Sequence, residues 1–569
     1  MTTLLLSVLL APTPAEACGG FFCNRDAPVD QSGETIVFEV DDEEDKVTMH
    51  VQVDYEGPSE SFAWVVPVRG VPDLFRSHDA LFTGLRNLTV PSFGARTDNT
   101  DCENGSYVYS YDYNASSSFP DSGSVDTGTL AGGGGVTVLD SGTVASYETV
   151  TLSAEDSTVL VDWLQENDFD VPDTMAEALA PYVAGGMNFV ALKLQKDAET
   201  GNLAPLGMRY EGTVPAVPLT LTAVAATDDM PMTIYLLGDA RGVPLNYLHV
   251  GLNPLAIDYW SGGTNIDDVI SRAADEAGGQ AFATESAQPL TNVRSLLFTD
   301  RMFDTTVLEG LGAADFVAAL PQAGFFGSPE VLEVLRTHIP VPASFPYDEN
   351  SFYNSPDYYA SYYDLIEDFD AAAAIADLED AEVEPREAAQ EMLDRSAYLT
   401  RMRSSVSPAE MTLDPHFGFN PDLPVVDDLG WLDVKRLCDD VIVDYMDAPQ
   451  RLAYAYGQTV VIPSENALAS MGLTAFDYVQ GQSDFAALFI EQMYTSGDPE
   501  VLVDQTGQRL PDLTEDTMPG TQLPGTTTQG GLASDGGDAG EKGGCGCSNT
   551  GSAVGWLPLL GLLALGRRR

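Results

Sequence analysis

The chain has 569 residues, 44% of them hydrophobic, so it has the material for roughly two to four domains and is not a wholly disordered protein. It carries 87 acidic and 26 basic residues, for a formal net charge of −61. A surface this negative repels nucleic-acid phosphates and anionic lipids, which argues against both as partners. Such a charge is typical of proteins adapted to salty surroundings, and bulk binding of divalent cations is the alternative interpretation.

The N-terminus has features of an export signal. Leu4–Ala11 is a short apolar stretch, and Ala15-Glu16-Ala17 gives the small-x-small pattern that precedes a cleavage point. No Lys or Arg precedes the apolar stretch, which departs from an ordinary signal peptide and leaves open a start codon farther upstream. We predict that residues 1–17 are a signal peptide. Lipoprotein processing at Cys18 is the alternative.

The first half of the body is expected to be rich in β-strands. Residues 34–40 and 46–53 flank the acidic turn 41–45, a pattern that predicts a hairpin. The turn lacks the spaced ligands and central glycine of a Ca²⁺ loop, so we interpret it as a solvated turn. A polar insertion at 97–135 is expected to be a flexible surface loop. Further expected elements are strands at 62–68, 136–152, 188–194, 217–226 and 231–237, and helices that begin at 153 and 174.

From Ile266 onward the pattern favours helices. The candidate helices are 267–277, 305–311, 313–320, 329–338, 358–376 and 384–403, followed by a strand at 452–462. The predicted fold class is α+β, with a β-rich N-terminal half that contains inserted helices and a more helical C-terminal half. We place one domain at 18–260, a second region at 261–510 and a flexible linker at 511–544.

Tyrosines are concentrated at 347–363. They are either a carbohydrate-binding platform or residues that pack at interfaces with their hydroxyls in water, which is the commoner use of tyrosine.

The six cysteines form two groups. Cys18, Cys23, Cys102 and Cys438 lie in the predicted exported body, where an oxidising exterior favours disulfides. Four cysteines allow three connectivities, and the sequence alone does not choose among them. If Cys18 and Cys23 close a small loop, a bond between Cys102 and Cys438 would join distant parts of the chain. Metal ligation is the weaker alternative because no histidines cluster near these thiols.

Few residues suggest catalysis. The five histidines are His50, His78, His249, His338 and His416. No His-Glu-x-x-His zinc motif and no Gly-x-Ser-x-Gly nucleophile elbow occurs in the sequence. His50 is expected to be a partly exposed structural histidine. His249 precedes Asp258, which would be a carboxylate able to orient it as a base. Arg401 and Arg403 are expected to pair with carboxylates such as Asp394 or to form a small anion-binding spot.

Residues 545–569 have the composition of a sorting signal. Cys545 and Cys547 follow a glycine-rich approach, an apolar run spans about 551–566, and Arg567-Arg568-Arg569 ends the sequence. About 16 helical residues reach roughly 24 Å, short of the ~30 Å of a comfortable permanent membrane span. Positive residues stay cytoplasmic, which places the rest of the chain outside. A permanent tail anchor or a buried C-terminal helix is the alternative.

This order of Gly-Cys motif, short helix and Arg cluster resembles the myxobacterial C-terminal sorting signal (MYXO-CTERM type). The resemblance implies that a sorting protease reads the tail, that Cys545 or Cys547 is the point of processing and lipidation, and that the short transmembrane helix is removed afterwards. A sorting protease and the membrane are therefore the expected partners of the tail, and the cell surface or outer membrane is the expected location.

The body also resembles a known family. The residues that carry the likeness are Cys18-Gly-Gly-Phe-Phe-Cys23, Phe62-Ala-Trp-Val-Val-Pro-Val68, Asp162-Trp163-Leu164, Tyr398-Leu-Thr-Arg-Met-Arg403 and Ser407-Pro-Ala-Glu-Met411. They are similar to exported bacterial proteins of the domain-of-unknown-function 2330 family, over roughly Cys18–Trp260 and again near Tyr398–Met411, while 266–397 fit less well. The resemblance implies an exported, disulfide-containing domain and supplies no activity.

The expected function is that of an exported, surface-anchored envelope, adhesion or binding protein without enzymatic activity. No catalytic residue, cofactor site or metal site is assigned, with Ca²⁺ kept as an alternative cofactor, and the ligand stays unknown. The two alternative functions are a secreted hydrolase acting on glycans or other polymers and a binding module that depends on divalent cations.

Overall fold

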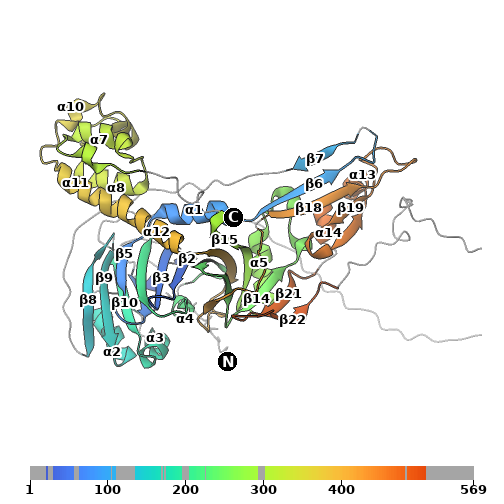
Figure 1. Cartoon of the computed structure of the whole chain (residues 1–569), viewed down its shortest axis with the longest axis horizontal. Helices are drawn as coiled ribbons and strands as arrows, with labels where there is room; N and C mark the ends of the chain where they lie inside the picture. Colours follow the sequence, from blue (N-terminus) through green and yellow to red (C-terminus); the bar gives the residue numbers. More distant parts are fainter. Residues whose placement is uncertain are drawn as a thin grey trace, which may run out of the picture. The chain divides into compact units, whose positions relative to one another are not determined.

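The computed structural model describes residues 21–22, 30–56, 63–103, 105–110, 135–145, 147–167, 169, 171, 175–194, 204–224, 226–292, 302–427, 429–480 and 484–507. All of them belong to one compact unit, Met1–Pro524. They form a mixed α+β protein, which confirms the α+β part of the predicted fold class (Figure 1). No helix in these ranges has the length and hydropathy needed to cross a bilayer. The predicted linker and sorting signal lie outside the described residues.

Four sheets contain all the strands of the described ranges. The strands are β1 (Phe21–Phe22), β2 (Asp30–Asp41), β3 (Lys46–Glu56), β4 (Ala63–Val68), β5 (Asp73–Arg76), β6 (Ser92–Asp98), β7 (Tyr107–Ser110), β8 (Val136–Val144), β9 (Tyr147–Ala154), β10 (Asn188–Leu194), β11 (Leu206–Glu211), β12 (Met230–Gly238), β13 (Arg241–Pro244), β14 (Leu248–Leu252), β15 (Ala281–Pro289), β16 (Tyr398–Val406), β17 (Phe417–Asn420), β18 (Leu429–Arg436), β19 (Gln450–Ala453), β20 (Thr459–Ile462), β21 (Ala487–Gln492) and β22 (Glu500–Asp504).

Helices connect these strands. They are α1 (Asp79–Thr89), α2 (Ser157–Glu166), α3 (Met175–Ala184), α4 (Leu219–Thr222), α5 (Ile266–Glu276), α7 (Ala313–Ala323), α8 (Pro329–His338), α9 (Glu349–Asn354), α10 (Ala360–Tyr363), α11 (Ala371–Leu378), α12 (Glu384–Arg395), α13 (Glu465–Met471) and α14 (Ala475–Gln480). Short 3₁₀ turns include η3 (Tyr259–Ser261), η5 (Thr305–Leu308) and η7 (Ala455–Gly457), and a π-helical turn, η6 (Glu379–Val383), precedes α12.

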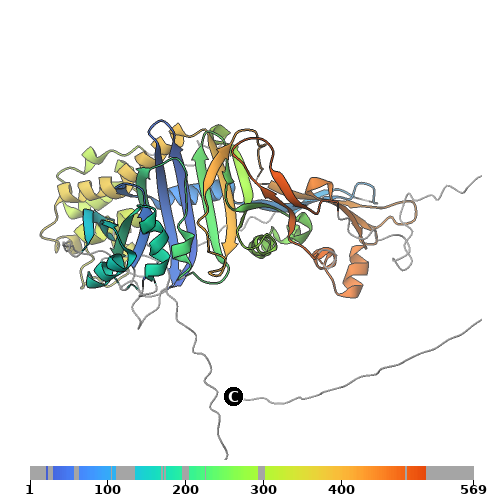
Figure 2. The same ribbon diagram turned by 90° about the horizontal axis from the view of Figure 1, so that it is seen from below.

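A ten-stranded sheet forms the centre of the unit, in the order β22-β21-β14-β15-β16-β12-β2-β3-β11-β5 (Figure 2). Most neighbours are antiparallel, but β12 runs parallel to β2, and β14 runs parallel to β15. The β2–β3 hairpin turns at the acidic residues 42–45, which confirms the predicted hairpin. The sheet contains strands that precede residue 260 in the sequence and strands that follow it. The two predicted regions of the body therefore share one hydrogen-bonded sheet.

Successive side chains of the central strands point to opposite faces of the sheet. On one face, Ile36, Phe38 and Ile234 pack against side chains of the five-stranded sheet β1-β4-β10-β9-β8. The far face of that smaller sheet is covered by α2 and α3. On the other face of the large sheet, Val37 and Tyr235 pack against α1 and α12 (Figure 1). The central strands β2 and β12 are therefore buried on both faces.

A helical lobe is inserted in the sequence between two strands that are neighbours in the large sheet. β15 and β16 pair with each other, yet α7 to α12 lie between them in the sequence. The lobe has its own core, which includes the fully buried Phe316, Phe325 and Phe352. A third sheet, β20-β19-β18-β6-β7, joins strands from near residue 95 to strands beyond residue 429. It shares a core with α5.

Several predicted elements are wrong. The predicted loop 97–135 contains the strand β7, which pairs with β6, and the predicted strand 452–462 is two strands, β19 and β20, separated by η7. The helix expected to begin at 153 begins at Ser157, with Asp156 as its N-cap. The predicted strand 217–226 contains the helical turn α4, because Pro218 precedes a run that buries Leu219 and Leu221. The predicted helix 358–376 is broken between α10 and α11 by the acidic stretch 364–370, where Asp370 caps α11. The predicted helix 384–403 ends at Arg395, and residues from Tyr398 onward form β16, the partner of both β12 and β15.

Candidate functional site

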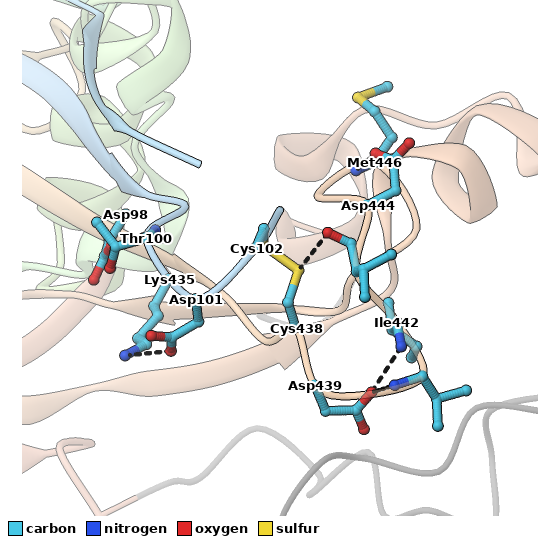
Figure 3. The surroundings of a disulfide bond; sticks show 12 residues. Asp98, Thr100, Asp101, Cys102, Lys435, Cys438, Asp439, Ile442, Asp444 and Met446 are labelled. Carbon is cyan, nitrogen blue, oxygen red and sulfur yellow. Dashed lines mark hydrogen bonds and ion pairs between the residues drawn. A yellow bond between two sulfur atoms is a disulfide. The ribbon is translucent and has the colours of Figure 1, made fainter. Parts of the chain in front are cut away.

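A disulfide joins Cys102 to Cys438 across 336 residues of sequence, with Cα atoms 5.1 Å apart (Figure 3). The parallel pairing of β6 and β18 explains why the two cysteines lie together. β6 and β18 run side by side in the same direction, with Asp98 opposite Lys435, so their carboxyl ends lie together. Cys102 follows the end of β6 and Cys438 follows the end of β18. Cys18 and Cys23 lie outside the described residues.

Polar contacts fix the two segments that carry the cysteines. The carboxylate of Asp98 accepts hydrogen bonds from the N–H and the hydroxyl of Thr100, which folds the turn before Cys102. Asp439 accepts from two N–H groups of its own loop, and Lys435 pairs with Asp101 at 2.8 Å (Figure 3). The disulfide therefore joins two turns that these hydrogen bonds and this ion pair hold in place.

A pocket of about 520 Å³ among the described residues is a candidate for ligand binding. Its volume lies within the range typical of small-molecule sites. The walls are mainly apolar, and its lining residues are Pro67, Val68, Arg69, Tyr182, Met187, Tyr210, Glu211, Gly212, Thr213, Val214, Ala216, Pro218, Asp414 and His416.

Asp414 organises one wall of this pocket. Its Oδ2 accepts a 2.6 Å hydrogen bond from the Tyr182 hydroxyl, and its Oδ1 accepts from the N–H and hydroxyl of Thr220. Burial, followed by the charge of Asp414, raises the pKa of Tyr182 far above its usual value, so this phenol stays protonated. Arg69 and His416 are exposed at the same pocket. A fixed carboxylate, an exposed cation and apolar walls give the pocket both shape and polarity.

His249 contacts partners that the sequence did not indicate. It lies on β14 between β21 and β15, and its Nδ1 is 3.3 Å from Oε2 of Glu491, while its Nε2 is 3.1 Å from Oγ1 of Thr284. Asp258, the expected partner, instead caps η3 through the N–H groups of Trp260 and Ser261. The alternative in which Asp258 orients His249 is therefore contradicted, because the cross-strand neighbour Glu491 supplies the carboxylate.

The protonation of His249 follows from these contacts. Burial lowers its pKa, and the nearby charge of Arg241 lowers it further, against the opposing effect of the bond to Glu491. The neutral ring then donates its Nδ1 proton to Glu491, and Nε2 is left to accept the Thr284 hydroxyl proton. This is the connectivity of a carboxylate, base and hydroxyl relay. Arg241 lies nearby, 6% exposed, and its Nε has no hydrogen-bond partner among the described residues.

A second buried histidine joins the helical lobe to the large sheet. His78 is the N-cap of α1, and its Nδ1 accepts a 2.9 Å hydrogen bond from the N–H of Ala80. Its Nε2 lies 3.0 Å from Glu382 in η6, and its Nδ1 lies 3.4 Å from Glu330 in α8. All three side chains are at most 5% exposed. The lobe is also held by ion pairs from Arg76 to Glu333 and from Arg395 to Glu39.

His78, Glu330 and Glu382 could supply metal ligands, since one atom from each lies within 4.8 Å of the others. The hydrogen bonds argue against that use. With Nδ1 accepting from a backbone N–H, the neutral ring carries its proton on Nε2 and donates it to Glu382. Glu382 also accepts from Arg386 and Ser328. Both ring nitrogens of His78 already have hydrogen-bond partners, and each of the two glutamates lies beside a different ring nitrogen. The cluster therefore fits a hydrogen-bonded junction better than a metal centre.

The other residues that the sequence singled out take part in hydrogen bonds and ion pairs within the fold. His50 is buried and bonded to the Ser77 hydroxyl at 2.7 Å, so the expectation of partial exposure is wrong. Arg401 and Arg403 pair with Glu285, and Arg403 also pairs with Asp267. Asp394 is therefore not the partner expected for them: it lies on α12, whereas both arginines lie on β16. In the turn 41–45, Asp41 accepts from the N–H groups of Glu43 and Glu44 and pairs with Arg209.

Loss of the disulfide should destabilise the protein. In the double variant Cys102→Ala/Cys438→Ala we expect a loss of roughly 2–5 kcal/mol of unfolding free energy, because the bond closes a very long loop. Urea denaturation without reductant measures it. With reductant the wild type and the variant should unfold at the same urea concentration, and equal midpoints in both conditions would show that the bond adds no stability.

Asp79 makes the junction of the lobe sensitive to pH. Burial, followed by the charge of Glu330, raises its pKa from an ordinary 3.8 to about 6. The folded state therefore binds a proton more tightly than the unfolded state, and stability falls as pH rises from about 4 through 6. Asp79→Asn should escape this loss and be more stable than wild type by about 1–2 kcal/mol above pH 6, with no advantage near pH 4.

Denaturation at a series of pH values checks this, with the exposed Asp73→Asn on neighbouring β5 as the control. The control should stay within about 0.5 kcal/mol of wild type at every pH. An Asp79→Asn advantage that is constant with pH would contradict the assignment.

Comparison with known proteins gives one match. No curated protein and no solved structure matches the chain. The family model of uncharacterized proteins conserved in bacteria (DUF2330) matches residues 12–417, well over half of the sequence. The match is continuous, so it includes the segment 266–397 that fits the family less well by inspection. The chain belongs to the DUF2330 family of uncharacterized bacterial proteins.

Proposed function

We propose that this protein is an exported binding protein of the bacterial envelope, held at the cell surface by its C-terminal tail. The observation that carries the proposal is the Cys102–Cys438 disulfide, because such bonds form and persist in oxidising compartments outside the cytoplasm. The apolar Leu4–Ala11 stretch and the small residues before Cys18 supply a matching export signal.

The tail supports the anchoring part of the proposal. Its Gly-Cys motif, apolar run and terminal arginines resemble the MYXO-CTERM type of sorting signal, which points to a myxobacterial sorting protease and the membrane as its partners. Cleavage near Cys545 or Cys547 would leave the body on the 511–544 linker with a lipid at its end. The folded unit would then face the medium, where its large negative charge keeps it soluble at high ionic strength.

The pocket beside Asp414 supports the binding part. It combines apolar walls with fixed polar groups, the arrangement common to small-molecule sites. The ordered hydrogen bonds from Tyr182 and Thr220 hold its carboxylate before any ligand arrives. Binding therefore needs little reorganisation of this wall.

Mass spectrometry of the protein purified from membranes tests export and anchoring. We expect an N-terminus after Ala17, a C-terminus at Cys545 or Cys547 that carries a lipid, and a disulfide-linked peptide pair containing Cys102 and Cys438. Cys545→Ser/Cys547→Ser should retain the C-terminal arginines and lose the lipid. A full-length chain in the cytosol with reduced thiols would overturn the proposal.

Hydrolysis of acyl esters is a second candidate function, and it rests on the Glu491–His249–Thr284 relay. The Thr284 oxygen would attack the acyl carbon while its proton passes to Nε2 of His249, and that proton would then leave with the alcohol. Water would complete the cycle by attacking the acyl-threonine and giving a proton to His249, which passes that proton to the departing Thr284 oxygen as the acid is released. We rank this second because His249 is only 6% exposed.

The relay has a direct test with p-nitrophenyl esters. If hydrolysis is the function, Thr284→Val should lower the rate at least about 100-fold, since it removes the nucleophile and keeps the side-chain shape. Thr151→Val, a buried threonine on β9 of the other sheet, is the matched control and should keep full activity. A wild-type rate no higher than that of Thr284→Val would exclude this function.

A further inference from the structure

The helical lobe includes α7, α8, α10 and α11 (Figure 1). Four of its tyrosines are exposed or partly exposed and contact one another or Phe345. We call Tyr347, Tyr358, Tyr359 and Tyr362 the tyrosine surface. Tyr358 is 83% exposed and Tyr347 is 61% exposed, while Tyr359 and Tyr362 are partly exposed. Large aromatic side chains seldom gather in water without a partner, so such a surface marks an interaction site.

The rings of the tyrosine surface are held in place from below. Phe345 makes edge-to-face contacts with Tyr347, Tyr359 and Tyr362, at centroid distances of 5.8, 4.9 and 5.1 Å. Phe345 in turn contacts Phe352, which is fully buried in the core of the lobe. The surface is thus anchored by packing and is ordered before a partner arrives, which lowers the entropic cost of binding.

The tyrosine surface and the tyrosines of the core differ in the hydrogen bonds of their hydroxyl groups. The buried Tyr353 and Tyr363 donate hydrogen bonds to the carbonyls of Ile339 and Phe352. Within the described ranges, no hydroxyl of the tyrosine surface has a hydrogen-bond partner in the protein. Their ring faces and phenol groups are left for water or for a ligand.

The sequence around the surface is strongly acidic, although Glu349 is neutralised by its ion pair with Arg336. Residues 337–385 contain twelve Asp or Glu residues and no Lys or Arg. Asp357 directly precedes Tyr358, and Asp364 follows α10. Both are exposed, and neither takes part in an ion pair among the described residues. Asp348 and the neighbouring tyrosines also act on Tyr359, whose pKa is raised by partial desolvation first and by these groups next.

The angles between the rings decide between two ligand classes. A platform for sugar rings needs aromatic faces that lie near one plane. Here the interplanar angles are 43° for Tyr347–Tyr359, 88° for Tyr358–Tyr359 and 67° for Tyr359–Tyr362. Faces turned in several directions beside carboxylates suit cations, which attract both the face of an aromatic ring and a neighbouring carboxylate.

We propose that the tyrosine surface binds a basic segment of another protein, whose Arg or Lys side chains lie against the exposed rings and pair with Asp357 and Asp364. Charge complementarity selects this occupant: a second copy of the chain carries the same net charge of −61 and is repelled. This surface belongs to the helical lobe, whereas none of the residues that line the pocket beside Asp414 does.

Fluorescence anisotropy with the purified mature chain tests the proposal. The probe is a fluorescein-labelled peptide of alternating Gly and Arg with four arginines, in 0.15 M NaCl. Tyr347→Ala/Tyr358→Ala should weaken binding roughly 5- to 30-fold, the loss expected for two exposed cation–π contacts. Tyr347→Phe/Tyr358→Phe should stay within about twofold of wild type because the ring faces remain. Asp357→Asn/Asp364→Asn should weaken binding and reduce its dependence on salt.

A matched control separates this surface from general attraction to an acidic protein. Tyr445 is 42% exposed and follows Asp444 directly, but it lies outside the helical lobe. Tyr445→Ala should bind the peptide as wild type does. The proposal is overturned if Tyr445→Ala and Tyr347→Ala/Tyr358→Ala weaken binding equally, or if neither does. It is also overturned if neutral cellohexaose, and not the peptide, loses affinity in Tyr347→Ala/Tyr358→Ala. Circular dichroism confirms that each variant is folded.

Discussion

The pairing of β16 with both β12 and β15 holds the unit together. β12 ends at Gly238, and its partner β16 begins only at Tyr398. The two strands can therefore pair only after the long segment between them has left the line of the sheet. The helical lobe is that stretch in large part, and its own apolar core lets it fold as an excursion from the sheet. Loop-closure entropy opposes such distant pairing, and the buried face of the sheet offsets it.

Charge is the second constraint. The chain has few cations, and several of the arginines near the core are used to pair buried carboxylates. Arg401 pairs with Glu285 inside the sheet, and Arg76 and Arg395 pair with glutamates where the lobe meets it. Leaving any of these carboxylates buried without its partner would be costly. Arg241 is the exception among the described residues, since it is buried near Glu491 but donates a hydrogen bond to the carbonyl of Pro424 and makes no ion pair within the described ranges.

Local patterns in the sequence predicted local structure well. The β2–β3 hairpin, the helix 329–338 and the strand 188–194 follow from alternation, capping residues and breakers that act within a few residues of one another. The segment 384–403 was misjudged because good helix formers such as Glu387 and Met392 run straight into Tyr398–Val406. That segment becomes a strand only because β12 and β15 lie on either side of it.

The candidate sites were mostly beyond prediction for the same reason. Thr284, His249 and Glu491 meet because three strands from distant segments are neighbours, and no spacing in the sequence records that. The same holds for His78, Glu330 and Glu382. For the disulfide, the pairing of Cys102 with Cys438 was one of three open choices until the parallel β6–β18 pair was known. The tyrosines at 347–363 were visible in the sequence, but the tilt of their rings was not.

The covalent link between Cys102 and Cys438 also decides how the molecule carries mechanical load. A body tethered at one end and pulled at the other transmits tension along the shortest covalent route. That route crosses directly from one sulfur to the other, so the long stretch between the two cysteines, with the helical lobe and five of the ten strands of the large sheet, bears no force. Tension would therefore fall on the strands outside this covalent loop, β2, β3, β5, β21 and β22, and would bypass the strands and helices inside it.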